Sequence, residues 1–99
     1  MPYIVLVTAV ADKLFKKLPK SVKNSLVNEA LALADNPLKG EQLTGELRAF
    51  RALHVKLNNV HYRIAYEVND LTHVVLVRAV AVRENFYKRL EKMKLKKVA

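Results

Sequence analysis

Four side chains that can carry positive charge alternate along one short stretch of the chain, HVKLNNVHYR. They are His54, Lys56, His61 and Arg63, and they flank Asn58-Asn59. Asparagine tolerates positive φ, so an Asn pair between two alternating runs predicts a β-hairpin with a two-residue turn. In that register His54 lies opposite Arg63, and all four side chains share one face. Cations gathered in this way repel one another, so we expect this face to bind an anion.

The other face of the predicted hairpin carries apolar side chains. They belong to Leu53, Val55, Leu57, Val60, Tyr62, Ile64 and Tyr66. Residues two apart along a strand point to the same side, so this face is expected to be buried. Both tyrosines are accordingly interpreted as core residues. His61, next to the turn, and His73, in a predicted loop, are expected to carry no chemistry.

The composition predicts a single domain, residues 1–99, with a basic surface. The 99 residues are 52% hydrophobic, which suits one core, and carry a net charge of +9. Residues 51–99 hold eleven Lys and Arg against four Asp and Glu, whereas residues 1–50 hold seven against five. A basic half of this kind indicates a nucleic acid, an acidic protein or an anionic membrane surface as partner.

Neither export nor membrane insertion is expected. The apolar start at residues 3–11 lacks a basic beginning and is too short for a signal peptide. The later apolar run at residues 74–82 is interrupted by Arg78 and cannot span a bilayer. The chain has no cysteine, so it contains neither disulfides nor thiolate metal sites. A cytoplasmic location is expected.

The elements that position the hairpin follow from the apolar periodicity. Residues 3–8 are apolar on both faces, which predicts a strand buried by later elements. Two helices follow, the first ended by Pro19 and the second opened by Ser21 as N-cap and stopped by Asn36-Pro37. Their core positions recur at helical spacing: Ala11, Leu14, Phe15, Leu18, Val22, Leu26, Ala30 and Leu33.

The second half is predicted to consist mainly of strands. Residues 38–46, which hold both glycines, form a loop before the hairpin, and residues 73–82 form an interior strand because they are apolar on both faces. A basic helix is expected from Glu84, with Phe86, Leu90 and Met93 on its apolar side. The order β-α-α-β-β-β-α predicts an α+β fold, an antiparallel twisted sheet with two N-terminal helices packed on it.

Four segments of the chain, LFKKLPKSVK, NPLKGEQLTGEL, HYRIAYEVND and VRAVAVRENFYKRL, resemble toxins of the RelE/ParE superfamily from type II toxin–antitoxin systems. The resemblance covers nearly the whole chain and implies a compact sheet with two N-terminal helices. It also implies a cytoplasmic toxin that a cognate antitoxin holds inactive. The RelE branch implies cleavage of mRNA in the ribosomal A site. The ParE branch implies the poisoning of DNA gyrase without nuclease chemistry.

The resemblance also assigns candidate catalytic residues. Lys56 and Arg63 match basic positions of the RelE cleavage site. Arg83 matches the arginine after the last strand, and Tyr87 matches the tyrosine near the C-terminus. His54 stands where RelE itself has a lysine. No cofactor or metal is expected, because no Asp/Glu cluster or His/Cys spacing suggests one.

Each of these side chains suits one step of metal-independent RNA cleavage. Arg63 and Arg83 can bind phosphate oxygens bidentately, and Lys56 adds positive charge at the transition state. His54, whose unperturbed pKa of about 6.5 cationic neighbours should lower, is the preferred general base, with Lys56 as its rival. Tyr87 either stacks on a base or donates a proton.

Two other functions stay open beside the preferred interpretation, an RNA-cleaving toxin. A gyrase inhibitor without nuclease activity, or an inactive relic that only binds an antitoxin, is favoured by Val82, where many RelE-like nucleases have a histidine. Arg78 has the opposite strand parity from Arg83 in a regular strand, so it is expected to be structural or to face the antitoxin. That antitoxin is expected to be acidic and partly disordered, because the toxin is strongly basic.

Overall fold

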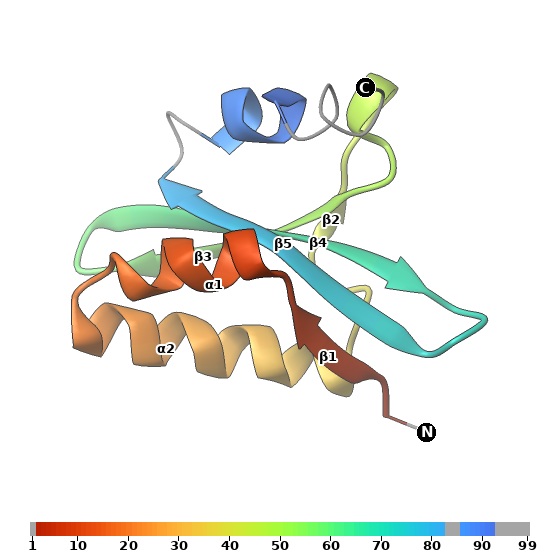
Figure 1. Ribbon diagram of the computed structural model, residues 1–99, viewed down its shortest axis with the longest axis horizontal. Helices are drawn as coiled ribbons and strands as arrows, with labels where there is room; N and C mark the ends of the chain where they lie inside the picture. The colour runs from red at the N-terminus through yellow and green to blue at the C-terminus, as the bar shows by residue number, and fades with distance from the viewer. Residues whose placement is uncertain (1, 83–85, 93–99) are drawn as a thin grey trace.

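The computed structural model describes residues 2–82 and 86–92, which form one β-sheet with helices on both faces (Figure 1). The five strands lie in the order β1-β5-β4-β3-β2. Their bounds are β1 Ile4–Val7, β2 Glu41–Gln42, β3 Arg51–Leu57, β4 Val60–Asn69 and β5 Val74–Val82. The helices are α1 Ala9–Lys16, α2 Lys20–Leu31 and a terminal helix at residues 86–92, with 3-10 turns at Ala32–Ala34 and Gly45–Leu47. The predicted α+β fold is confirmed.

The sheet is mixed rather than antiparallel throughout. β1 runs parallel to β5, with Val5 opposite Val75, and the other neighbouring strands are antiparallel. The prediction of a buried first strand is wrong, because β1 is an edge strand and Ile4 is 62% exposed. Only one side of β1 is paired, while Tyr3 and Val5 pack against the core. β5 lies between β1 and β4 and is interior, as expected.

Both N-terminal helices cover the same face of the sheet (Figure 1). α1 is capped by Thr8, whose hydroxyl oxygen accepts a hydrogen bond from the Ala11 amide at 3.1 Å. α2 begins at Lys20, directly after Pro19. The prediction of Ser21 as N-cap is therefore wrong. Pro19 takes that place, with the extended ψ of 144° from which a helix can start.

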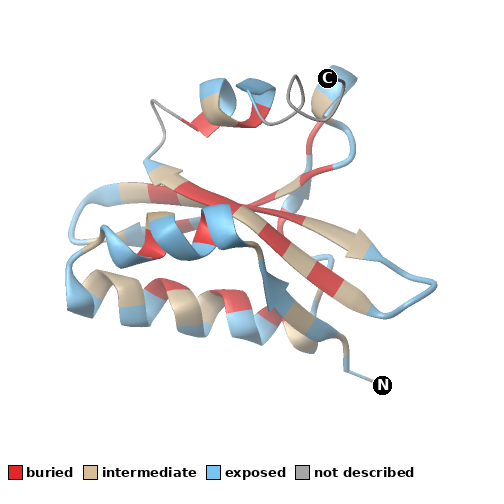
Figure 2. Ribbon diagram, viewed as in Figure 1, coloured by how far each residue is buried: buried red, intermediate tan, exposed pale blue. Residues whose placement is uncertain are grey.

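Each face of the sheet carries an apolar cluster (Figure 2). On the far face from α1 and α2, Phe86 and Leu90 of the terminal helix are fully buried against small alanines of the strands. Glu84 and Met93, the other predicted residues of this helix, lie outside the described residues. The cluster beneath α1 and α2 holds larger side chains, among them Phe15, Leu26, Leu33, Leu53, Val55, Tyr62, Ile64, Tyr66, Val75 and Val77.

The hairpin of β3 and β4 adopts the predicted register. Asn58 and Asn59 have φ of 50° and 66°, the left-handed conformation that a two-residue turn of this kind needs. The predicted buried face is confirmed except beside the turn at the end of the sheet, where Leu57 is only partly buried and Val60 is 39% exposed. The observed pairs are Leu53 with Ile64, His54 with Arg63, Val55 with Tyr62, Lys56 with His61 and Leu57 with Val60.

A β-bulge in β5 changes the expected direction of Arg78. Tyr66 pairs with Val77 and Ala65 pairs with Ala79, so Arg78 is an extra residue on this strand. The bulge interrupts the alternation of a regular strand. The prediction that Arg78 and residue 83 point to opposite faces assumed a regular strand, so it does not hold here. Residue 83 itself lies outside the described residues.

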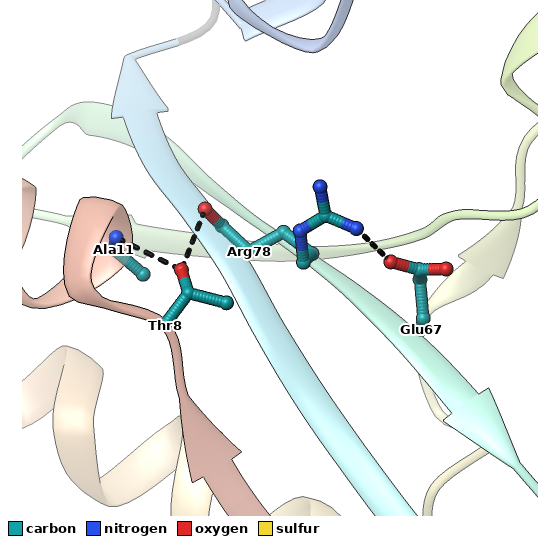
Figure 3. Close-up of polar contacts among 4 residues, drawn as sticks. All are labelled: Thr8, Ala11, Glu67 and Arg78. Carbon is teal, nitrogen blue, oxygen red and sulfur yellow. Dashed lines mark hydrogen bonds and ion pairs between the residues drawn. The ribbon is translucent and has the colours of Figure 1, made fainter. Parts of the chain in front are cut away.

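The bulge gives Arg78 a structural role (Figure 3). Its guanidinium forms an ion pair with Glu67 and lies 5.5 Å from the ring centroid of Phe50. Its carbonyl oxygen accepts a hydrogen bond of 3.5 Å from the Thr8 hydroxyl. Since Thr8 also caps α1, this bond ties the junction of β1 and α1 to β5. The structural interpretation of Arg78 is confirmed, and a contact with an antitoxin stays a prediction.

The segment predicted as a loop at residues 38–46 contains the short strand β2. Tyr66, whose ring is fully buried, holds this segment: its hydroxyl donates to the Pro37 carbonyl at 2.7 Å and accepts from the Gly40 amide at 2.8 Å. A Cβ at Gly40 would lie 2.7 Å from that hydroxyl and 2.8 Å from the Ala52 carbonyl oxygen, so only glycine fits. A strand of two residues is too short to produce an alternating pattern, and the prediction missed it for that reason.

We expect Tyr66→Phe to destabilise the fold by about 1–3 kcal/mol, because the buried Pro37 carbonyl and Gly40 amide lose their partner. Burial raises the pKa of Tyr66 above its usual 10.0, although the Gly40 hydrogen bond and Arg51 oppose the rise. The folded state thus disfavours the phenolate more than the unfolded state does. Wild-type stability should be full below about pH 10 and fall as the pH rises through the higher folded pKa.

Urea denaturation at neutral and at alkaline pH measures both effects. In Tyr66→Phe the alkaline fall in unfolding free energy should be smaller than in the wild type. Tyr62→Phe, which changes another core tyrosine of the same strand, is the control and should retain the wild-type alkaline fall. Equal stability of Tyr66→Phe and wild type at neutral pH would contradict the proposed anchoring of the segment.

Candidate anion-binding site

Four predicted side chains gather on one face of the β3–β4 hairpin. His54 and Lys56 are exposed, whereas His61 and Arg63 are half-buried. Arg63 pairs across β4 and β5 with Ala81, which packs against the cluster beneath the terminal helix. The cationic face therefore adjoins the part of the sheet that the terminal helix covers.

The two histidines of this face contact each other. His54 Nε2 lies 2.7 Å from His61 Nδ1, and the rings stack with centroids 4.9 Å apart and an interplanar angle of 26°. One nitrogen of this bond must donate and the other must accept, so the contact requires a lone pair on one ring. The prediction assigned no chemistry to His61. Its diagonal position across the hairpin from His54 was the signal that such side chains can meet.

Arg63 is the most enclosed cation of the group. Its side chain is only 13% exposed, and its Nε is buried without a hydrogen-bond acceptor among residues 2–82 and 86–92. One guanidinium nitrogen, Nη1, lies 4.0 Å from the Glu41 carboxylate, which is 68% exposed. Beside Arg63 the surface is hollowed into a shallow pocket of about 390 Å³, lined by Lys39, Gly40, Glu41, Ala52, Leu53, His54 and Arg63.

Two further predicted site residues, Arg83 and Tyr87, follow β5 in the sequence. Arg83 lies outside the described residues. Tyr87 lies on the terminal helix, 43% exposed, with its ring edge-on to Phe86 at 5.1 Å between centroids. The exposed ring is compatible with stacking on a base and with packing beside Phe86, so its role stays a prediction.

Two charged residues of this pocket were absent from the predicted site. Glu41 and Lys39 come from the segment before the hairpin, which contains β2. Neither has a spacing relation to the hairpin cations that a sequence pattern would reveal. They reach the site because Glu41 pairs with Ala52, on the strand that also carries His54.

The arrangement suits the binding of a phosphate group. The guanidinium of Arg63, the Lys39 side chain and the His54 imidazole line one pocket, and such groups bind phosphate oxygens by charge-assisted hydrogen bonds. Within residues 2–82 and 86–92, no three His, Cys, Asp or Glu side chains gather in a way that could hold a metal ion. No helix in those ranges is long and apolar enough to cross a bilayer.

Solved structures with a similar fold include RelE toxins. A chain of the RelBE2 toxin–antitoxin complex from Mycobacterium tuberculosis is 28% identical, with a TM-score of 0.76 over 84% of this chain and 100% of its own. The E. coli toxin RelE, solved as a mutant in the free state, is 21% identical, with a TM-score of 0.74 over 100% of both chains. A chain of the archaeal RelE–RelB complex from Pyrococcus horikoshii is 18% identical, with a TM-score of 0.56 over 84% of this chain and 98% of its own. The last two comparisons show the fold alone.

Sequence comparison identifies the family. Among proteins with a curated function, no match was found. A family model for the ParE-like toxin of type II bacterial toxin–antitoxin systems matches residues 5–91, a span that includes both N-terminal helices and the complete hairpin. The predicted resemblance to the RelE/ParE superfamily is thereby confirmed, and the chain belongs to the ParE-like toxins of type II bacterial toxin–antitoxin systems.

Proposed function

We propose that this toxin is a ribosome-dependent endoribonuclease of the RelE type, which cleaves mRNA in the ribosomal A site and thereby inhibits translation in the cytoplasm. The observation that carries the proposal is the enclosed guanidinium of Arg63, which lines a pocket together with His54 and has its ion-pair partner, Glu41, at 4.0 Å. A phosphate of the RNA backbone can bind a guanidinium at such a pocket bidentately.

In the proposed reaction the ribose 2′-oxygen loses its proton to His54 and attacks the adjacent phosphorus. The bond from phosphorus to the 5′-oxygen of the next nucleotide breaks, which leaves a 2′,3′-cyclic phosphate and a 5′-hydroxyl. Arg63, Lys56 and Arg83 stabilise the negative charge that develops on the phosphorane. Tyr87 stacks on a base or donates the proton that the leaving oxygen takes up.

The contact between the two histidines is compatible with His54 or His61 as the neutral ring, and His54 remains our proposed base. Their hydrogen bond requires a lone pair on one ring nitrogen, so the two rings cannot both be cationic imidazoliums while the bond exists. Lys56 is the rival base. Its ammonium is exposed on the same face, where it can instead stabilise negative charge on the phosphorane.

Gyrase inhibition without nuclease activity is the second candidate. The family model that matches is described as ParE-like, and β5 ends in Val82, where many RelE-like nucleases have a histidine. In this alternative the same cationic face contacts a protein rather than RNA. A relic that has kept only antitoxin binding is the third candidate.

We also propose an acidic antitoxin as the partner of this chain. The similar toxins from Mycobacterium tuberculosis and Pyrococcus horikoshii were solved as toxin–antitoxin complexes. The net charge of +9 favours an acidic partner, and the exposed outer edge of β1 can accept an added strand.

Induction in a bacterial host, followed by mapping of new mRNA 5′ ends, tests the proposed function. Codon-phased cuts are expected, and Arg63→Ala should reduce cleavage on the order of 10²-fold or more because it removes a donor to the transition state. Arg83→Ala should act in the same direction. Arg48→Ala is the matched control, since it removes an exposed arginine whose side chain bonds the Gly45 carbonyl at 3.4 Å.

Circular-dichroism melts should show that each variant keeps its fold. Full toxicity of a folded Arg63→Ala, Arg83→Ala double variant would refute the proposed site. Intact mRNA together with broken chromosomal DNA would instead support gyrase inhibition. Absence of both lesions, with antitoxin binding retained, would support the relic.

The variant His54→Lys separates the two candidate bases. If His54 accepts the 2′-hydroxyl proton, the wild-type rate rises with pH through the histidine pKa, and the variant should lose activity near neutrality or shift its pH profile upward. Lys56→Ala is the companion measurement: it should lower the rate without moving the profile. A His54→Lys variant with the wild-type rate and profile would reduce His54 to one more contact with RNA.

Association with the antitoxin should be fast and sensitive to salt. Charge complementarity accelerates encounter, so we expect the association rate constant to fall at least about ten-fold from low to high ionic strength. Stopped-flow mixing of toxin and antitoxin measures this rate. A basic antitoxin, or an association rate that is independent of salt, would contradict the electrostatic part of the proposal.

A further inference from the structure

Arg63 carries more hydrogen-bond donors than the surrounding protein satisfies. A guanidinium has five N–H groups, and burying such donors without acceptors costs free energy. Its side chain is 13% exposed and its Nε is buried with no acceptor within the described ranges. Its ion-pair partner, the Glu41 carboxylate, lies 4.0 Å from Nη1, which is too far for a hydrogen bond.

Glu41 is held beside this pocket by its backbone but not by its side chain. β2 pairs Glu41 with Ala52, and the preceding residue, Gly40, is fixed by its hydrogen bond to Tyr66. The Glu41 side chain is 68% exposed, so its carboxylate can rotate into solvent while β2 stays in place. An exposed ion pair of this kind contributes at most a small stabilisation.

A second cationic side chain, Lys39, lines the pocket beside Glu41 and Arg63. Its ammonium lies 3.8 Å from the Glu29 carboxylate on α2. A phosphate group carries its charge on several oxygens and can bind a guanidinium bidentately, which the carboxylate at 4.0 Å does not do. A phosphate placed here would therefore satisfy Arg63 better than Glu41 does.

We propose that Glu41 is the resident counter-ion of Arg63, that a backbone phosphate of RNA replaces it on binding, and that Lys39 is the second cation of this phosphate site. The proposal rests on the proposed function, because it takes RNA as the incoming anion. Glu41 is not a catalytic residue: it neutralises Arg63 in the free toxin and lowers the affinity for RNA.

Equilibrium binding of a fluorescent 2′-O-methyl RNA, which lacks the attacking hydroxyl, tests the exchange. Glu41→Gln should bind about two- to five-fold more tightly than the wild type, because the phosphate no longer competes with a carboxylate. Asp12→Asn is the matched control, since it also removes one exposed carboxylate from an ion pair, with Lys16 at 3.0 Å. Its effect measures the general gain from one less negative charge.

The decisive comparison repeats both substitutions in an Arg63→Ala background. There the advantage of Glu41→Gln over Asp12→Asn should vanish, because the pair with Arg63 no longer exists. Equal gains from Glu41→Gln and Asp12→Asn, or an advantage that persists without Arg63, would overturn the proposal. Lys39→Ala should weaken binding in both the wild-type and Glu41→Gln proteins, and unchanged binding would remove Lys39 from the site.

A titration with inorganic phosphate separates this inference from the proposed function. The NMR signal of the Arg63 Nε–H group should shift at lower phosphate concentration in Glu41→Gln than in the wild type or in Asp12→Asn. If wild type and Arg63→Ala bind the RNA equally, the proposed RNA site fails and RNA is excluded as the incoming anion. If RNA binding depends on Arg63 but neither RNA nor phosphate responds to Glu41→Gln, only the counter-ion role fails.

Discussion

The two hydrogen bonds of the Tyr66 hydroxyl fix the segment that precedes the hairpin and lines the candidate site. The ring belongs to the core beneath the N-terminal helices, while its oxygen bonds the chain at Pro37 and Gly40. The absence of a side chain at Gly40 allows this close approach, and β2 can then pair with β3. One core side chain thus determines where Glu41 and Lys39 lie relative to the hairpin.

The main apolar core and the candidate site lie on opposite faces of the sheet. Large aliphatic and aromatic side chains fill the face beneath α1 and α2, where burial of apolar area provides most of the stabilisation. On the other face, Ala52, Ala65 and Ala79 leave room for the terminal helix, and the cations lie beyond them toward the hairpin turn. Polar and charged groups at the exposed end of this face can therefore change with little effect on the main core.

Much of the fold was predictable because local signals agreed with the tertiary arrangement. The Asn58-Asn59 turn and the alternation on either side of it specified the register, the buried tyrosines and the shared face of His54 and Arg63. The errors arose where another constraint decided. β1 is apolar on both faces yet lies at an edge, the bulge at Arg78 interrupts the regular alternation of β5, and β2 is too short to leave a pattern. Glu41 could not be assigned to the site, since only the pairing of β2 with β3 brings it near Arg63.

The enclosure of Arg63 bears on which function this family member has kept. A fold shared by toxins with different targets does not by itself decide the activity, which depends on individual side chains. The same face of the sheet accepts alanine at positions 52 and 65, and an apolar residue in place of a poorly paired buried cation is often neutral or stabilising. Among the described residues, the unmet hydrogen bond of Arg63 Nε costs the isolated fold free energy, and an anion bound to the guanidinium would offset part of that cost. That balance favours a toxin that still binds an anionic partner through this face over a relic in which the site has no ligand.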